Sequence, residues 1–237
     1  MNMLDRWKRS LGAFAGGAVY DHKGGSSAGA AAYARQLERD RRDQKELTIP
    51  LQDLPVTVID FETTGFSPAK GDKILSIGAV RIENGKREMF YSPIFTEQPP
   101  EAVLELTGLT KQELLDAEPA SEVVKDFLAF SSNSTLVAHH SAHEKAFLNA
   151  TLWKLYRMKL SRRVVDTKFA VMHITELEKA ASLEEFCRYF QIEPEGRHHA
   201  LHDAKSTADI WTSACNSCAR NGIYTLADMY KQAAEKA

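Results

Sequence analysis

The 237-residue chain has little of several features that define whole classes of protein. Its three cysteines are too few for a disulfide framework and indicate a reducing compartment. No apolar run approaches the roughly 18 residues that a membrane-spanning helix needs. The N-terminus has an early basic cluster, but glycines and charges interrupt the segment after this cluster, which argues against a secretory signal. We therefore expect a cytoplasmic protein with no membrane partner.

An excess of charge of either sign is also missing. The formal net charge of −2 argues against a strongly basic coat for nucleic acid, but it leaves a local basic groove open. The composition, 43% hydrophobic and 26% charged, supplies enough apolar material for one core. The length fits one sizeable domain with an extension, or two small domains.

The first 50 residues differ in composition from the rest. Six of the thirteen glycines fall between Gly12 and Gly29, which predicts a flexible linker. The apolar residues before it recur at helical spacing, and this helix either packs on its own domain or docks elsewhere: Leu4, Trp7, Leu11 and Phe14. Residues 28–46 predict a helix with a solvated, mixed-charge face. We therefore divide the chain into an N-terminal extension, 1–50, partly helical with a Gly/Ser-rich linker and a candidate docking segment, and a domain, 51–237.

Within residues 51–237, strand patterns come first and then alternate with helix patterns. Residues 56–60, "VTVID", predict a short buried strand, and residues 73–94 predict two strands around the turn Asn84-Gly85. Further short strands, "STLVAH" and "RRVVDT", are separated by helices, one of which begins after Ser182 as N-cap. The last two helices run from about His199 to Arg220 and from Thr225. This order predicts an α/β fold, a mixed sheet covered by helices.

The octet "VIDFETTG" carries two carboxylates at the end of the first strand. Asp60 and Glu62 stand two apart, so in an extended chain both side chains point to the same side. Two converging carboxylates repel unless a cation neutralises them, and oxygen-only ligation favours Mg²⁺ or Mn²⁺. The turn Thr63-Thr64-Gly65 then offers hydroxyls and close backbone approach to a substrate. The octet alone is equally compatible with ordinary exposed acids at a strand end.

Candidates for further ligands come later in the chain. Glu144 lies in the first turn of a predicted helix, and Asp203 lies in another helix start. Four carboxylates with no cysteine suit a two-cation site, in which ions about 3.5–4 Å apart clamp the attacking and leaving oxygens of a phosphodiester. His198 can then accept a proton from the attacking water, because the pKa of histidine lies near working pH.

Three blocks, "DFETTG", "VAHHSAHEKAFL" and "HHALHDA", resemble the motifs of the DnaQ-like, or DEDDh, 3′-5′ exonuclease family in order and spacing. The resemblance covers about residues 55–221. It implies a ribonuclease H-like fold, a mixed β-sheet flanked by helices on both sides. It also implies a nucleic-acid 3′ end as substrate and two divalent cations, Mg²⁺ or Mn²⁺, as cofactors.

The resemblance also implies roles for individual residues. Asp60 and Glu62 match the metal ligands of the first block, with Asp60 bridging the two ions, and Asp203 matches the ligand of the third. The family pattern His-x-Ala-x-x-Asp makes His198 the general base. His199 and His202 fall at positions that the family leaves open.

Two departures from the family pattern stand out. The second block normally reads His-Asn-x-x-Phe-Asp, and here His140, His143 and Glu144 replace the asparagine, phenylalanine and aspartate. Glutamate keeps the charge and reaches one methylene further, so we expect Glu144 to remain a ligand, directly or through water. The family also often has a histidine before Gly108, near the 3′-terminal nucleotide, where this chain has a threonine. The candidate substrate-binding residues are Thr63, Thr64, Gly65, Phe66 and Thr107.

Two other clusters have an alternative interpretation. Six of the eight histidines fall at His139, His140, His143, His198, His199 and His202, and the spacing of His198 and His202 would suit zinc on one helix. The neighbouring carboxylates favour hard cations instead. Cys215 and Cys218 form a CxxC pair that we expect to pack in the core. Phe61 and Phe147 are also expected in the core.

The sequence therefore predicts a 3′-5′ exonuclease that releases nucleoside 5′-monophosphates from a nucleic-acid 3′ end, DNA rather than RNA. Two alternatives stay open. In the first, the chain is a proofreading subunit, and residues 1–50 bind a polymerase or another replication or repair protein. In the second, it is a catalytically weak nucleic-acid-binding module. The complete set Asp60, Glu62, His198 and Asp203 argues against the last, because binding alone needs no base beside the metals.

Overall fold

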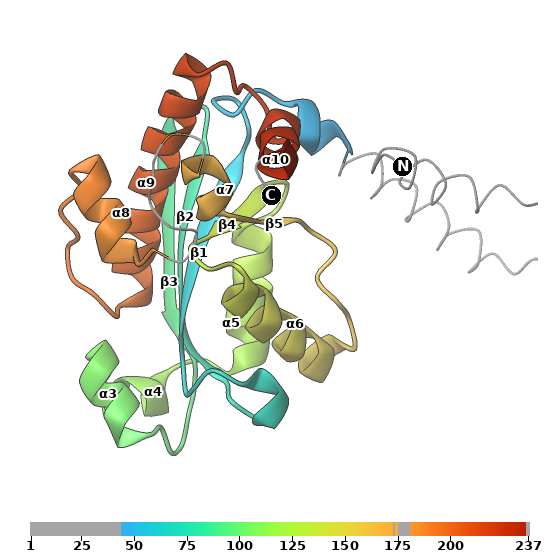
Figure 1. Cartoon of the computed structure of the whole chain (residues 1–237). Coiled ribbons are helices and arrows are strands. Elements are labelled where there is room, and N and C mark those ends of the chain that lie inside the picture. Colours follow the sequence, from blue (N-terminus) through green and yellow to red (C-terminus); the bar gives the residue numbers. More distant parts are fainter. Residues whose placement is uncertain (1–43, 173, 175–180, 236–237) are drawn as a thin grey trace, which may run out of the picture. The chain divides into compact units, whose positions relative to one another are not determined.

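The computed structural model describes residues 44–172, 174 and 181–235 (Figure 1). The predicted N-terminal helix, the glycine-rich linker and most of the charged helix 28–46 lie outside the described residues. A five-stranded sheet has the order β3-β2-β1-β4-β5. Its strands are β1 (Val56–Thr63), β2 (Ile74–Glu83), β3 (Lys86–Pro93), β4 (Thr135–Ala138) and β5 (Val164–Asp166).

The sheet is mixed, as the sequence predicts. Strands β1, β2 and β3 pair antiparallel, whereas β4 pairs parallel with β1 and β5 parallel with β4. The predicted hairpin turn is present between β2 and β3, where Asn84 has φ 51° and Gly85 has φ 74°. Positive φ at both positions is what a two-residue turn with the twist of the flanking strands requires.

The helices predicted from the sequence after residue 119 are present as α5, α6, α8, α9 and α10. Ser182 caps its helix as predicted, and Glu185 completes a capping box. The sequence patterns did not predict α3 and α4, which are only seven and six residues long. The helices are α3 (Glu101–Thr107), α4 (Lys111–Asp116), α5 (Ala120–Phe130), α6 (Ala142–Tyr156), α7 (Thr167–Val171), α8 (Leu183–Phe190), α9 (Ala200–Arg220) and α10 (Leu226–Glu235), with a 3-10 helix, η1 (Pro68–Lys70).

Alternate residues of the strands face two separate apolar clusters. Val58 of β1 packs in a cluster with residues of α7, α8, α9 and α10, while Ile59 and Phe61 pack in another with residues of α5 and α6. Helices therefore cover both faces of the sheet (Figure 1). Cys215 and Cys218 are buried in the first cluster and Phe147 in the second, so the predicted packing roles are confirmed.

The segment just before β1 is joined to the far end of the chain. The backbone N–H of Leu51 donates to the carbonyl of Tyr224 at 2.8 Å, and Leu47 and Ile49 pack against the first cluster. Residues 47–49, which the sequence assigns to the extension, therefore contact the domain core. None of the described helices is both long and apolar enough to cross a membrane.

Candidate active site

One row of residues across three strands supports the start of α9. Asp60 of β1 pairs with Gly78 of β2, and Gly78 pairs with Tyr91 of β3. A Cβ on Gly78 would lie 2.1 Å from the backbone carbonyl carbon of Ala200, so the first turn of α9 lies directly on the sheet. The ring of Tyr91 stacks on the ring of His199 with centroids 4.6 Å apart. Only glycine allows this approach, which brings α9 beside Asp60.

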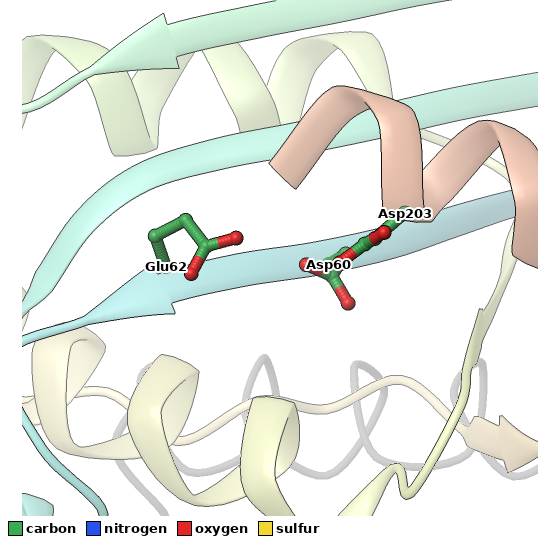
Figure 2. Close-up of side chains that lie close together, drawn as sticks. All are labelled: Asp60, Glu62 and Asp203. Carbon is green, nitrogen blue, oxygen red and sulfur yellow. The ribbon is translucent and has the colours of Figure 1, made fainter. Parts of the chain in front are cut away.

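Three carboxylates meet where α9 approaches β1. Asp60 and Glu62 project from β1 and Asp203 from the first turn of α9 (Figure 2). Each offers an oxygen, and these oxygens all lie within 4.8 Å of one another. The described residues bring together no other such group, and no histidine belongs to this one. The expectation that Asp60 and Glu62 point to the same side is confirmed.

Glu144, in the first turn of α6, lies outside this group of three but lines the same cavity. Its side chain is buried, and Oε2 has no hydrogen-bond partner among the described residues. Its charge is the largest electrostatic contribution that raises the pKa of Asp60. Glu144 therefore lies close enough to Asp60 and Glu62 for their charges to interact.

The cavity has a volume of about 420 Å³, and its lining is rich in charged and aromatic side chains. The lining residues that bear on its chemistry are Asp60, Glu62, Phe66, His140, His143, Glu144, Glu184, Arg197, His198 and Asp203. The cavity thus brings together Asp60, Glu62, Glu144, His198 and Asp203; their roles in catalysis and metal binding stay predictions. Phe66 is 89% exposed, and its ring centroid lies 6.2 Å from that of His143.

Burial and mutual repulsion raise the pKa of three carboxyls in this cavity. Burial, followed by the charges of Glu144, Asp203 and Glu62, raises the pKa of Asp60 well above its ordinary value. Burial and Asp203 raise the pKa of Glu62 to about 7. Burial, with Asp166 and Glu62, raises the pKa of Glu144 to about 8.

Converging acids of this kind fit a hard divalent cation, which would remove the repulsion. An orphaned oxygen supports the fit, because Oδ1 of Asp203 is buried and has no hydrogen-bond partner among the described residues. All the ligands offered are oxygens, which favours Mg²⁺ or Mn²⁺ over zinc.

His198 lies immediately before α9 and lines the cavity. Its backbone is left-handed, with φ 59°, and its N–H donates to Oδ2 of Asp203 at 3.2 Å. His202 lies on α9, where its ring stacks on His199 and its Nε2 is 3.7 Å from Glu195. His198 and His202 therefore do not form a zinc-type pair on one helix, because the helix begins after His198.

In the turn after β1, the polar side chains form hydrogen bonds with other residues of the same loop. The hydroxyl of Thr63 donates to the carbonyl of Gly65 at 2.7 Å, and that of Thr64 donates to Asp72 and accepts from the N–H of Lys73. A Cβ on Gly65 would lie 2.5 Å from Oδ2 of Asp72. These contacts hold the loop that carries Phe66. Substrate contacts by Thr63, Thr64 and Gly65 stay predictions.

Thr107 is buried near the end of α3, where its hydroxyl donates to the carbonyl of Val103 at 2.8 Å. It does not line the cavity described above. A substrate contact by Thr107 also stays a prediction.

The structure adds site residues that the sequence motifs did not single out. Asp166 accepts from the N–H of Ser141 at 2.9 Å and from the N–H of Lys168 at 3.0 Å, which joins the end of β5 to the start of α6. It lies beside His139 of the second motif, whose Nδ1 is 3.0 Å from the hydroxyl of Thr167. Two further residues that the motifs did not single out are Arg197, which lines the cavity, and Gly78, against which α9 lies. Only the glycine inside an alternating strand pattern was a readable signal, because it marks close backbone approach.

Comparison with known proteins gives the family and the fold of the chain. The family model described as Exonuclease (RNase_T) matches residues 57–211. Among curated relatives, DNA polymerase III PolC-type of Halalkalibacterium halodurans is 32% identical over 184 residues, 76% of this chain and 13% of the relative. The same enzyme of Bacillus subtilis is 32% identical over 179 residues, 73% of this chain and 12% of the relative. The chain thus spans only a small part of these relatives.

Solved structures share the fold at lower identity. One, described as 3′-end specific recognition of histone mRNA stem-loop by 3′-exonuclease, has a TM-score of 0.61 and 18% identity, covering 90% of this chain and 81% of that one. Another, Exonuclease X in complex with 5′ overhanging duplex DNA, has a TM-score of 0.55 and 17% identity, covering 73% and 98%. The predicted ribonuclease H-like fold is confirmed.

The chain belongs to the RNase_T exonuclease family, which confirms the DnaQ-like resemblance.

Replacing Gly78 by alanine tests the contact between α9 and the sheet. The new Cβ would overlap the backbone at Ala200, so α9 must shift and carry Asp203 away from Asp60. We expect a loss of about 2 kcal/mol in the free energy of unfolding, measured by urea denaturation, and a loss of cation-dependent stabilisation. Gly196→Ala is the control, because its Cβ would meet only Nδ1 of His202, at 3.3 Å. Equal stability of the two variants would contradict the account.

The raised pKa values predict how stability depends on pH without metal. In the native state Glu62 and Glu144 hold protons up to about pH 7 and about pH 8, whereas ordinary glutamates release them near 4.5. The lowered pKa of His139, about 4 because of burial, makes stability rise with pH, but only below pH 6.5. In EDTA the melting temperature should therefore fall as pH rises from 6.5 through 8. Excess Mg²⁺ should flatten this slope, and an unchanged slope would contradict the cation site.

Proposed function

We propose that the chain is a 3′-5′ exonuclease that releases nucleoside 5′-monophosphates from a nucleic-acid 3′ end with two divalent cations. The observation that carries this proposal is the convergence of Asp60, Glu62 and Asp203 to within 4.8 Å, with His198 lining the same cavity. A cavity of about 420 Å³ fits one terminal nucleotide rather than a long duplex. We propose DNA as the preferred substrate, since the curated relatives are DNA polymerases.

Asp60, Glu62 and Asp203 would hold the cations, with Glu144 as a further ligand directly or through water. Bound Mg²⁺ or Mn²⁺ supplies charge stabilisation of the attacking and leaving oxygens. The imidazole of His198 accepts the proton of the attacking water. The backbone N–H of His198 donates to Asp203, so the base and a ligand are fixed to each other by one hydrogen bond at 3.2 Å.

Phe66 is the side chain that we propose for contact with the terminal base. It is 89% exposed at the rim of the cavity, and the loop behind it is held by Asp72. Aromatic side chains in such positions stack on bases without strong sequence preference. Thr63, Thr64, Gly65 and Thr107 remain weaker candidates because their polar groups already bond within the protein.

The proofreading role is the second candidate, since the relatives are PolC-type polymerases. In that case residues 1–50 would bind the polymerase or another replication or repair protein, in a cytoplasmic location. The observation that argues against the weak binding module is His198 lining the same cavity as the carboxylates, because a proton acceptor serves chemistry rather than binding.

The proposed activity is tested with 5′-labelled DNA and RNA strands of one sequence. We expect a stepwise ladder shortening from the 3′ end in Mg²⁺ or Mn²⁺, faster on DNA. His198→Ala should lower the rate by about 100-fold or more, since it removes the proton acceptor, and Asp60→Ala should abolish the ladder. Cys187→Ser, at a buried site outside the cavity, is the control. A ladder that survives both substitutions, or cleavage from the 5′ end, would overturn the proposal.

A further inference from the structure

One arginine joins two walls of the cavity. Arg197 lies in the segment between α8 and α9, and its Nε donates to Oε1 of Glu184 at 2.6 Å. Its Nη1 lies 2.5 Å from Oδ2 of Asp203 as an ion pair, without the geometry of a regular hydrogen bond. One guanidinium therefore links the first turn of α8 to the first turn of α9.

The two oxygens of Asp203 have different surroundings because of this contact. Oδ2 faces Arg197 and accepts the backbone N–H of His198, whereas Oδ1 is buried without a hydrogen-bond partner among the described residues. The Asp203 side chain is only 6% exposed, so water does not easily compensate Oδ1. Arg197 thus fixes the rotation of the carboxylate and leaves one oxygen for a cation.

Arg197 is also the sole lysine or arginine among the described residues that line the cavity. Its charge opposes the rise in the pKa of both Asp60 and Glu62. In turn its hydrogen bond lowers the pKa of Glu184 to about 2. The arginine is therefore a positive charge already present in an otherwise acidic site.

We propose that Arg197, held by Glu184, is a positioning residue that orients Asp203 for the cations and stands in for part of their charge when none is bound. The inference rests on the proposed function. A partner that fixes a metal-binding carboxylate in this way acts through geometry as well as charge. Arginine suits both tasks because its planar fork can engage two carboxylates at once, which a lysine ammonium does less well.

Melting temperatures with and without a divalent cation test the charge contribution of Arg197 separately from its orientation of Asp203. In EDTA, Arg197→Met should lower the melting temperature by about 5 °C, because Asp203 then lies buried without its positive partner. In saturating Mg²⁺ this gap should shrink by at least half, since the cations supply the missing charge. Arg188→Met is the control, because Arg188 is an exposed arginine on α8 that does not line the cavity.

Nuclease kinetics in saturating Mg²⁺ test orientation. Arg197→Met should lower kcat roughly tenfold with little change in KM, because Asp203 loses its fixed rotation. Arg197→Lys should restore the melting temperature in EDTA but not kcat. Glu184→Gln keeps the charge of Arg197 but weakens the contact that holds its guanidinium. It should lower kcat less than Arg197→Met does, and it replaces that variant as the test if Arg197→Met does not fold.

An equal melting gap in EDTA and in Mg²⁺, or an unchanged kcat in both Arg197→Met and Glu184→Gln, would overturn the inference. A wild-type protein that Mg²⁺ does not stabilise would instead contradict the proposed function, which the inference needs. The two failures are thus distinguishable by the wild-type measurement.

Discussion

The whole site depends on the contact of the first turn of α9 with the sheet at Gly78. Asp60 and Asp203 are more than 140 residues apart in sequence, and neither strand geometry nor helix geometry alone brings them together. They meet because β2 offers a backbone without a side chain, against which Ala200 lies directly. Tyr91, stacked on His199, supports the same turn from β3. One glycine thus couples the packing of the domain to the chemistry of its cavity.

This contact contributes to the raised pKa values in the cavity, because it brings Asp203 beside Asp60 and Glu62. Carboxylates brought together away from water raise each other's pKa, and their repulsion destabilises the fold unless a positive charge offsets it. The chain offsets part of it with Arg197, and we propose that divalent cations offset the rest. The same arrangement leaves Oδ1 of Asp203 without a partner among the described residues, where a ligand is needed. The same carboxylate charges therefore affect both the stability of the fold and the binding of metal.

Much of the fold can be predicted from local signals in the sequence. The turn Asn84-Gly85, the cap Ser182 and the apolar alternation of β1 each reflect an interaction between near neighbours, so the pattern reveals them. Asp60 and Glu62 were likewise predictable as a pair. Arg197 was not predictable, because its role arises from contacts with α8 and α9 that no periodicity encodes. Gly78 was readable as a point of close approach on a strand, but not as the contact with α9. The zinc-type spacing of His198 and His202, which the neighbouring carboxylates already argued against, is not a pair on one helix because the helix starts between them.

The most direct test of the central claim is the anomalous scattering of a crystal grown with Mn²⁺ and a nucleoside 5′-monophosphate. We expect two anomalous peaks in the cavity, with Asp60 in contact with both ions and one oxygen of Asp203 facing them while the other stays with Arg197. Absence of Mn²⁺ from Asp60, Glu62 and Asp203, or a metal bound by histidines instead, would contradict it.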